Sequence, residues 1–444
     1  WDIEEGQRRF TEMTLLLRIQ EIDLTEDITK IMNEIALNAR IANERLAAAS
    51  NEEKNVALNI MAEKIENNAK HILSENKKDI QIAKSSSLSE SMIDRLSIDD
   101  KDIKNIASSI RGIAKLDDPV GKILGSWDRP NGLHIKKISI PIGVIGIIYE
   151  SRPNVTADAA SLCLKSGNAS ILRSGSDSYF SSYAIYETIQ EGLKNTSIDS
   201  KSIQLVPSKD RDAVGLMLGG LDSSIDVIVP RGGKSLVSRV QSEAKIPVFG
   251  HLEGICHVYI NEKADIEKAI DVTVNAKMRR TSICGAAETL LIDKSIYKEY
   301  LPKILSKLSS LGCVIRGDIH IKDVFPQTEN ISDSDWATEY LDAIISVKIV
   351  NNIDEAISHI KRYGTGHTEA IISEDKKIAE YFFNQVNSSI ILLNASTQFA
   401  DGGEFGFGAE IGISTGKMHA RGPIGLDQLT TFKYTVYGNG QTRP

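Results

Sequence analysis

The chain has 444 residues, 41% of them hydrophobic and 25% charged, which is enough for two or three lobes with large buried cores. Its net charge of −8 disfavours binding to nucleic acid or to an anionic membrane surface, because the basic residues are scattered and outnumbered by acids. No apolar run approaches the roughly 20 residues of a membrane span, and no secretory signal is predicted at the start of the chain.

The cysteines indicate neither a disulfide framework nor a metal site. They lie far apart in the sequence and form no CxxC pair: Cys163, Cys256, Cys284 and Cys313. A protein of the reducing cytoplasm, without a bound metal, is therefore predicted.

The first quarter of the chain is predicted to be a layer of amphipathic helices, because apolar residues recur at spacings of three and four between about 26 and 84. A β-hairpin is predicted over about 122–140. Its turn would be formed by Asn131-Gly132, since both residues tolerate positive φ. A strand near 428–438 is expected to pair with this hairpin, because both would otherwise leave sheet edges exposed.

Short apolar strands alternate with helical stretches from 143 to 250, which predicts right-handed βαβ units on a parallel sheet and a Rossmann-like nucleotide domain. The strands are expected at 144–150, 169–173, 203–207, 225–230 and 247–250, and the helices at 155–165, 177–194, 209–219 and 233–243. A second alternating block follows, with a glycine-rich segment after it. Its strands are expected at 256–261, 289–293, 313–317, 343–350, 369–373 and 390–394, and its helices at 264–278, 295–311, 353–362 and 375–387.

The usual glycine signatures of nucleotide-binding loops are absent. PIGVIG has the wrong spacing for GxGxxG, and PRGGKS at 230–235 lacks the first glycine of a P-loop, which would stand at Ile228. A Rossmann-like domain that lacks these signatures limits the protein families to which the chain could belong.

The segment RRTSICGAAETLL at 279–291 places Cys284 where a loop is expected to turn into an apolar helix. Arg279, Arg280 and the backbone N–H groups of that helix would stabilise a thiolate, which is the form that attacks a carbonyl carbon. The alternative is a small buried side chain, because free cysteine is among the most buried residue types. The other three cysteines lie in apolar segments and are expected to be inert.

Five ordered segments give the chain a resemblance to the aldehyde dehydrogenases over roughly 30–440. They are PIGVIGIIYESRPNVTADAASLCLKSGNASILRSGSDS, VIVPRGGKSLVSRVQSEAKIPVFGHLEGICHVYI, MRRTSICGAAETLLID, DWATEYLDAIISVKIVNNIDEAISHIKRYGTGHTEAI and EFGFGAEIGISTGKMHARGPIGL. The resemblance implies an α/β fold with a Rossmann-like cofactor domain, an α/β catalytic domain and a β-hairpin oligomerisation arm. The implied bounds are 25–124 and 144–250 for the NADPH-binding domain with its helical layer, 251–424 for the catalytic domain, and 125–143 with 425–444 for the arm.

Within that family the chain resembles the branch that reduces an acyl phosphate. The implied reaction is the NADPH-dependent reduction of L-glutamyl 5-phosphate to L-glutamate 5-semialdehyde and phosphate through a cysteine thioester, in proline biosynthesis. Cys284 falls on the family's nucleophile, and Asn154 falls on the asparagine that donates to the oxyanion. His251, in HLEG, stands where oxidising relatives carry a glutamate that activates water. Its presence suits a thioester that is reduced instead of hydrolysed, and a plain structural histidine is the alternative.

The resemblance also implies a set of NADPH-binding residues. Arg173 matches the basic residue beside the adenosine ribose, where a guanidinium suits a 2′-phosphate and so favours NADPH over NADH. Ser174 and Ser176 would add donors. Gly233 resembles the family's cofactor-contacting turn, and Glu339 matches the glutamate that holds the nicotinamide ribose.

Substrate recognition requires positive groups for a carboxylate and a phosphoryl group. Arg280, Arg421 and His367 are the candidates, and a salt-bridged structural role is the alternative for each.

Two other functions compete with this interpretation. An aldehyde-oxidising dehydrogenase is disfavoured because position 251 is not glutamate. A non-catalytic subunit is disfavoured because Cys284, Asn154, Arg173 and Glu339 are all present. The arm implies, as in the family, a homodimer or a larger symmetric assembly.

Overall fold

The structure is a computed structural model that describes residues 28–443 except 87 and 89, and the chain divides into two compact units. Unit 1 consists of the chain up to Val248 together with the segment from Leu429 onward, and unit 2 is Phe249–Gln428. The expectation that the chain starts without a secretory signal, and the first residues of the predicted helical layer, fall on 1–27, outside the described residues. None of the described helices is long and apolar enough to cross a membrane.

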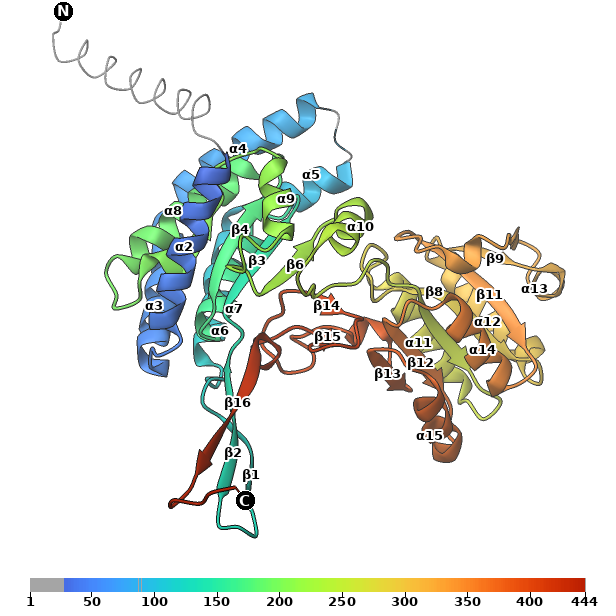
Figure 1. Ribbon diagram of the computed structural model, residues 1–444. Helices are drawn as coiled ribbons and strands as arrows, with labels where there is room; N and C mark the ends of the chain where they lie inside the picture. The colour runs from blue at the N-terminus through green and yellow to red at the C-terminus, as the bar shows by residue number, and fades with distance from the viewer. Residues whose placement is uncertain (1–27, 87, 89, 444) are drawn as a thin grey trace, which may run out of the picture. The chain divides into compact units, whose positions relative to one another are not determined.

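Helices open the described part of unit 1 (Figure 1). They are α2 (Ile28–Leu46), α3 (Asn51–Asn67), α4 (Ala69–Ser85), α5 (Glu90–Leu96) and α6 (Asp100–Lys115). A capping box starts α3, because the Ser50 side chain accepts from the Glu53 N–H while the Glu53 carboxylate accepts from the Ser50 N–H. The helical layer ends at Lys115, close to the end of the first quarter of the chain as predicted, although the periodic pattern that supported the prediction was seen only to about 84.

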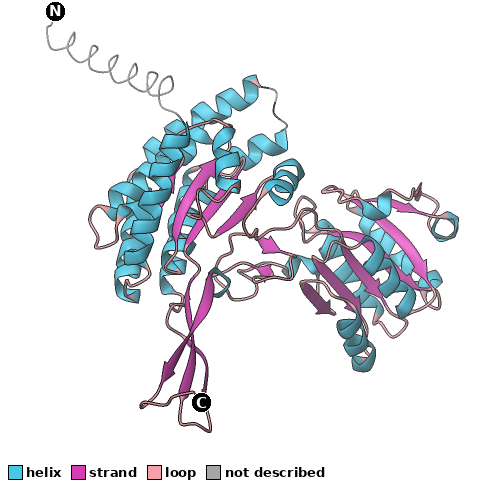
Figure 2. Ribbon diagram, in the orientation of Figure 1, coloured by secondary structure: helices cyan, strands magenta, loops and turns pink. Residues whose placement is uncertain are grey.

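A four-stranded parallel sheet in the order β5-β4-β3-β6 forms the centre of unit 1 (Figure 2). Its strands are β3 (Val144–Tyr149), β4 (Ala169–Ser174), β5 (Ile203–Leu205) and β6 (Val227–Arg231), and its connecting helices are α7 (Val155–Lys165), α8 (Tyr179–Leu193), α9 (Asp212–Leu218) and α10 (Lys234–Glu243). All residues of β3 and β4 are buried, as expected for a parallel sheet covered on both faces, and α2, α9 and α10 share one apolar cluster with it. The strand predicted at 247–250 is wrong, because Val248 forms only an isolated bridge with Ile228.

The predicted hairpin is present as β1 (Ile123–Asp128) and β2 (His134–Pro141), and β16 (Thr430–Tyr437) pairs antiparallel with β2. The turn is longer than the predicted two-residue form. The Arg129 N–H donates to the Leu133 carbonyl, and of Asn131 and Gly132 only Gly132 has a positive φ, 85°. A loop closed between residues 129 and 133 needs only one residue in the left-handed region, which glycine adopts without steric cost.

Unit 2 contains a seven-stranded parallel sheet in the order β10-β9-β11-β8-β7-β12-β13. The strands are β7 (Cys256–Ile260), β8 (Ala287–Asp293), β9 (Val314–Gly317), β10 (Glu329–Asn330), β11 (Ile344–Val350), β12 (Thr368–Ile372) and β13 (Ile390–Leu393). The helices are α11 (Ile266–Met278), α12 (Tyr297–Ser310), α13 (Ile319–Val324), α14 (Ile353–Tyr363) and α15 (Lys376–Gln385). The first three share one apolar cluster and the last two share another, so helices cover both faces of this sheet.

The glycine-rich segment after β13 has little regular structure. It contains a short antiparallel pair, β14 (Ile413–Ser414) and β15 (Gly422–Pro423), and single turns of 3-10 helix. This pair matters for the site because the Ile413 carbonyl contacts a histidine there.

Candidate active site

Cys284 lies in an irregular segment between α11 and β8. Its side chain is half-buried and packs against the small apolar cluster of Ile390, Ala400 and Ile413. The helix predicted to follow Cys284 is wrong, because β8 begins at Ala287 and every residue of that strand is buried within the sheet. A helix N-terminus therefore does not contribute to stabilising a Cys284 thiolate. Cys284 lies instead in the loop that leads directly into β8.

The two arginines before Cys284 are both exposed. Gln398 holds this segment in place: its Nε2 donates to the carbonyls of Ala276 at 2.9 Å and Arg280 at 3.1 Å. Arg279 Nη1 donates to Gln398 Oε1 at 3.4 Å. The path of the segment is thus set by backbone contacts, which leaves the Arg280 side chain at the surface.

Gly254 is in close contact with Cys284. A Cβ on Gly254 would lie 2.1 Å from the Cys284 carbonyl oxygen and 2.7 Å from Cys284 Cβ. The Gly254 N–H donates to Glu339 Oε1 at 2.8 Å. Glu339 and Cys284, distant in the sequence, therefore flank the same glycine, although the sequence did not single out Gly254.

Two histidines lie beside Cys284. One ligand atom from each of His251, Cys284 and His367 lies within 4.8 Å of the other two. The imidazole rings are T-shaped with centroids 4.7 Å apart, and His251 Nδ1 donates to the Ile413 carbonyl at 2.7 Å. His251 is half-buried, whereas His367 is fully buried. The two predicted histidines therefore belong to one cluster with the predicted nucleophile.

The remaining cysteines are all buried. Burial raises the pKa values of the Cys163 and Cys256 thiols, and it raises the pKa of Cys313 to about 12. Cys256 donates through Sγ to the Cys284 carbonyl at 3.1 Å. These three side chains therefore stay protonated, and Cys256 helps to position the Cys284 backbone.

A buried ion pair near the Glu339 segment was not predicted from the sequence. Lys277 Nζ lies 2.6 Å from Glu288 Oε2, and both side chains are at most 1% exposed. Burial raises the pKa of Glu288 to about 7, although Lys277 opposes that rise. Glu288 Oε1 also accepts from the Leu341 N–H at 3.4 Å, two residues after Glu339. A lysine in α11 and a glutamate in β8 give no local signal that they will meet.

Arg421 lies next to the residue before His367, because a Cβ on Gly366 would be 3.9 Å from Arg421 Nη2. Its guanidinium binds Asn387, through Nη1 to Oδ1 at 2.8 Å and through Nη2 to the carbonyl at 2.6 Å. Arg421 is half-buried in this arrangement.

The other predicted site residues lie at the carboxyl edge of the unit 1 sheet. Asn154 precedes α7, is exposed, and donates through Nδ2 to Asp158 Oδ2 at 2.9 Å. Burial raises the pKa of Asp158, and the bond from Asn154 counteracts that rise. The Asn154 carboxamide is thus oriented by the helix that it precedes.

Arg173 and Ser174 end β4, and both are buried, whereas Ser176 is exposed. Arg173 Nη1 donates to the Ser174 carbonyl at 2.7 Å. Its Nη2 donates to the carbonyls of Lys209 at 3.1 Å and Asp210 at 3.3 Å. Burial lowers the pKa of Arg173, and the nearby Glu150 carboxylate counteracts this effect.

Gly233 caps the start of α10, and its N–H donates to Glu150 Oε2 at 3.3 Å. Glu150 follows β3 directly, so it stands at the same carboxyl edge of the sheet. Burial raises the pKa of this carboxyl group. Glu150 was not predicted as a site residue, although a carboxylate directly after an apolar parallel strand is a recognisable signal.

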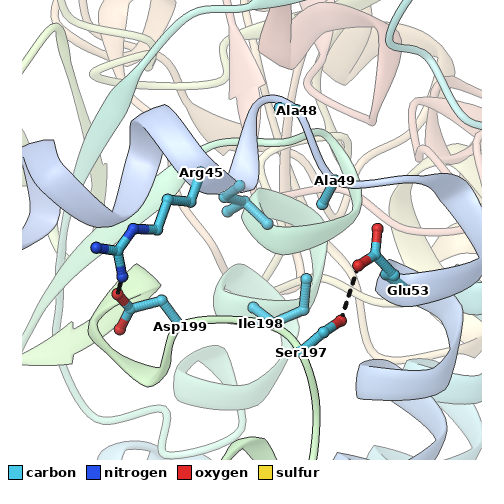
Figure 3. Close-up of a pocket in the computed structure, with 8 residues that line it drawn as sticks. Arg45, Ala48, Ala49, Glu53, Ser197, Ile198 and Asp199 are labelled. Carbon is cyan, nitrogen blue, oxygen red and sulfur yellow. Dashed lines mark hydrogen bonds and ion pairs between the residues drawn. The ribbon is translucent and has the colours of Figure 1, made fainter.

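A pocket of about 240 Å³ lies elsewhere in unit 1 (Figure 3). Arg45 Nη1 contacts Asp199 Oδ2 there at 3.0 Å, and Ser197 donates to Glu53 Oε1 at 3.0 Å. Ser197 and Asp199 precede β5, at the amino edge of the parallel sheet, opposite the edge where the predicted residues gather. Arg45 and Asp199 are paired with each other and Glu53 is held by serine side chains, and none of the three was predicted as a site residue.

Comparison with known proteins identifies the family. The model of the aldehyde dehydrogenase family matches residues 25–318. Gamma-glutamyl phosphate reductase of Rhizobium etli (strain CIAT 652) is 58% identical over 426 residues, 96% of this chain and 100% of that protein. The chain belongs to the aldehyde dehydrogenase family, in its gamma-glutamyl phosphate reductase branch. The gamma-glutamyl phosphate reductase of Brucella suis biovar 1 (strain 1330) is 55% identical over 420 residues, 95% of this chain and 100% of that protein.

The crystal structure of gamma-glutamyl phosphate reductase from Thermotoga maritima matches with a TM-score of 0.91 and 44% identity, covering 93% of this chain and 100% of that one. An acetylating aldehyde dehydrogenase from Geobacillus thermoglucosidasius, 18% identical with a TM-score of 0.65, shares the fold. The predicted family and its α/β fold are confirmed. The chain is therefore an oxidoreductase of this family, with a nicotinamide cofactor.

Proposed function

We propose that the chain is an enzyme that uses NADPH to reduce L-glutamyl 5-phosphate to L-glutamate 5-semialdehyde and phosphate, the second step of proline biosynthesis. The observation that carries this proposal is the 58% identity to the Rhizobium etli gamma-glutamyl phosphate reductase over 96% of the chain. The partial exposure of Cys284 supports it, because a nucleophilic thiol must be reached by its substrate.

Cys284 is the proposed nucleophile. Its thiolate attacks the γ-carbonyl carbon, the bond from that carbon to the phosphate oxygen breaks, and phosphate leaves with the electron pair. A thioester remains on Cys284. Because phosphate is a good leaving group, this step needs little acid assistance. The carbonyl oxygen gains negative charge during the attack, and the Cys284 N–H and the Asn154 carboxamide are the proposed donors to it.

His251 is proposed to leave the thioester available for reduction. It stands where the oxidising aldehyde dehydrogenases that the chain resembles carry a water-activating glutamate. Its ring is oriented through the bond from Nδ1 to the Ile413 carbonyl. Without a carboxylate at this position, attack of water on the thioester lacks its usual general base.

The carboxyl edge of the unit 1 sheet fits a nicotinamide dinucleotide, because such ligands bind beyond the carboxyl ends of parallel strands. Gly233 has open space where a Cβ would stand, and Arg173 Nε is buried without a hydrogen-bond partner among the described residues. The residues proposed to hold NADPH are Arg173, Ser174, Ser176 and Gly233, with Glu339 from unit 2. NADPH supplies the hydride that reduces the thioester. For Arg173 to bind a 2′-phosphate, its Nη atoms must give up their hydrogen bonds to backbone carbonyls and donate to phosphate oxygens instead.

Arg280, Arg421 and His367 are the proposed substrate ligands. Arg280 is exposed and thus available to an anionic group. Arg421 is already bound to Asn387, so substrate binding there would replace or extend those bonds. His367 is fully buried, so contact of its ring with the substrate would require the substrate to reach the interior beside Cys284.

The enzyme is proposed to work in the cytoplasm as a homodimer or larger assembly. The exposed apolar side chains on β1 and β16 support assembly through this sheet, because such side chains lose contact with water when a second subunit covers them.

The first test follows NADP⁺ reduction by the full-length chain with glutamate 5-semialdehyde, with and without inorganic phosphate. Turnover is expected to require phosphate, because the reverse reaction must return the acyl group to phosphate. Cys284→Ala is expected to lower turnover by at least about 10³-fold, since the covalent step is lost.

Cys313→Ala is the matched control, because it also removes a thiol from unit 2 but at a buried position in the apolar cluster of α11, α12 and α13. It is expected to keep turnover. Reduction of NADP⁺ that needs no phosphate and yields glutamate would contradict the proposal.

A further inference from the structure

His251, Cys284 and His367 bring two imidazoles and a thiol together from distant parts of unit 2. One ligand atom from each lies within 4.8 Å of the other two. Neighbouring ligand atoms in a tetrahedral zinc site are roughly 3.3–3.6 Å apart, given Zn–N of about 2.0 Å and Zn–S of about 2.3 Å. Side-chain movements of about 1 Å would therefore suffice for all three to reach one ion.

Both histidines are held through Nδ1. His251 Nδ1 donates to the Ile413 carbonyl at 2.7 Å, and a neutral imidazole that donates from Nδ1 carries its lone pair on Nε2. His367 Nδ1 lies 2.9 Å from Thr368 Oγ1 and 3.6 Å from Cys256 Sγ. A ring nitrogen held by the protein, with the other facing the ion, is the usual arrangement of metal-binding histidines.

The Nε2 atom of His367 also indicates a ligand, independently of the distances within the cluster. His367 is 0% exposed, and its Nε2 has no hydrogen-bond partner in the described part of the chain. A buried polar atom without a partner costs free energy, which coordination to a cation would recover.

We propose that His251, Cys284 and His367 bind Zn²⁺ and that this binding reversibly blocks the nucleophile. Two imidazoles and a thiolate suit a borderline-soft cation, whereas Mg²⁺ and Ca²⁺ prefer oxygen ligands. Three protein ligands leave the fourth position to water. As the Zn–S bond forms, the Cys284 thiol releases its proton to solvent, and its sulfur lone pair is no longer available for attack. The block of turnover rests on the proposed function, but the binding itself does not.

The binding test uses Co²⁺ as a spectroscopic probe with the full-length chain and no substrate. One equivalent of Co²⁺ is expected to produce a thiolate-to-metal charge-transfer band in the near ultraviolet, and Zn²⁺ but not Mg²⁺ is expected to abolish it. Cys284→Ser is expected to eliminate the band, and His251→Gln to weaken Co²⁺ binding at least about tenfold. His251 is half-buried, so this variant disturbs the core less than a substitution of the fully buried His367.

His320→Gln is the matched control, because His320 is exposed on α13, and it is expected to leave Co²⁺ binding unchanged. Cys256→Ser separates the two neighbouring sulfurs and is expected to keep the band. The proposal is overturned if the wild-type chain gives no band, or if the band survives Cys284→Ser.

A separate experiment measures phosphate-dependent turnover after Zn²⁺ is added and again after a chelator is added. Zn²⁺ is expected to abolish turnover, and the chelator is expected to restore it. If turnover never requires phosphate while the Co²⁺ band depends on Cys284 and His251, the site stands and the proposed function falls. If turnover requires phosphate but no band forms, the function stands and the metal site falls.

Discussion

At the scale of single residues, the position of Cys284 depends on the backbone that surrounds it. Gly254 allows the chain before β7 to pass so close to Cys284 that no Cβ fits between them. The same Gly254 donates its N–H to Glu339. A substitution at Gly254 is therefore expected to displace Cys284, the proposed nucleophile, and Glu339, the proposed ribose ligand, together.

Gly254→Ala is expected to lower kcat/KM by about 10²-fold, because its Cβ would push the Cys284 backbone by about 1 Å. Steady-state kinetics with the semialdehyde and phosphate would measure this loss, and circular dichroism would confirm that the variant folds. Gly112→Ala is the control, since Gly112 lies exposed in α6 and a Cβ added there would have nothing within 4 Å. It is expected to keep activity and to gain roughly 0.5–1 kcal/mol of stability. Equal kinetics for the two variants would contradict the role assigned to Gly254.

At the scale of elements, β7 and β12 are aligned by a buried pair behind the histidine cluster. His257 lies opposite Glu369 in the two strands, and both its backbone N–H and Nδ1 contact Glu369 Oε2 at 2.9 Å. Cys256 precedes His257, and His367 lies two residues before Glu369. This pair therefore helps to fix the register that brings Cys256 and His367 together.

Helix α14 covers this pair with His359, whose ring stands 5.5 Å from that of His257 and 5.0 Å from that of Trp336. Burial, the largest cause, and the electrostatic effects of His257, Lys348 and Arg362 together lower the pKa of His359 to about 3. The folded chain therefore keeps His359 neutral at pH values where the unfolded chain protonates it, below about 6.5.

The stability contributed by neutral His359 is fully present above pH 6.5 and is lost progressively as the pH falls toward 3. His359→Phe is expected to remove about 2 kcal/mol of the decrease in unfolding free energy between pH 7 and pH 5. Urea unfolding at the two pH values measures this difference. His320→Gln, at an exposed position of α13, should leave the decrease as in the wild type. An unchanged pH dependence in His359→Phe would show that His359 does not resist protonation in the fold.

At the scale of the whole molecule, the sheet of β1, β2 and β16 exposes apolar side chains that a lone subunit would leave in water. The exposed fractions are 55% for Tyr434, 54% for Val436 and 40% for Trp127. An antiparallel sheet with such side chains is a liability unless another surface covers it.

Tyr434→Lys combined with Val436→Lys is expected to shift the protein to a smaller species, because two charges would have to be buried on assembly. Size-exclusion chromatography with light scattering would measure the change. Ile319→Lys is the control, since Ile319 is 64% exposed but lies in unit 2. The mass of this variant in solution is expected to match that of the wild type. A wild-type chain that is monomeric, or a double variant with an unchanged mass, would contradict assembly through this sheet.

The sequence by itself determined most of the order of strands and helices, the hairpin and the family, and it supplied the proposal that Cys284 is the nucleophile. These features rest on local information: apolar periodicity, turn residues and ordered segments such as RRTSICGAAETLL. After Cys284 local information gave two conflicting expectations, a helix and a strand at 289–293. The strand is confirmed as part of β8 and the helix is wrong, because the sheet on either side provides hydrogen bonds and burial. At 247–250 the apolar residues are typical of a strand, but the segment forms only an isolated bridge with the sheet.

Only the tertiary structure decided which side chains meet. His251, Cys284 and His367 are distant along the chain, and no spacing rule connects them, so the absence of CxxC pairs gave no warning of a cluster with metal-ligand chemistry. The contact of Gly254 with Cys284 and the pair of Lys277 with Glu288 are equally non-local. Such contacts depend on strand order and register, which are set by packing across the whole sheet and not by the residues that take part.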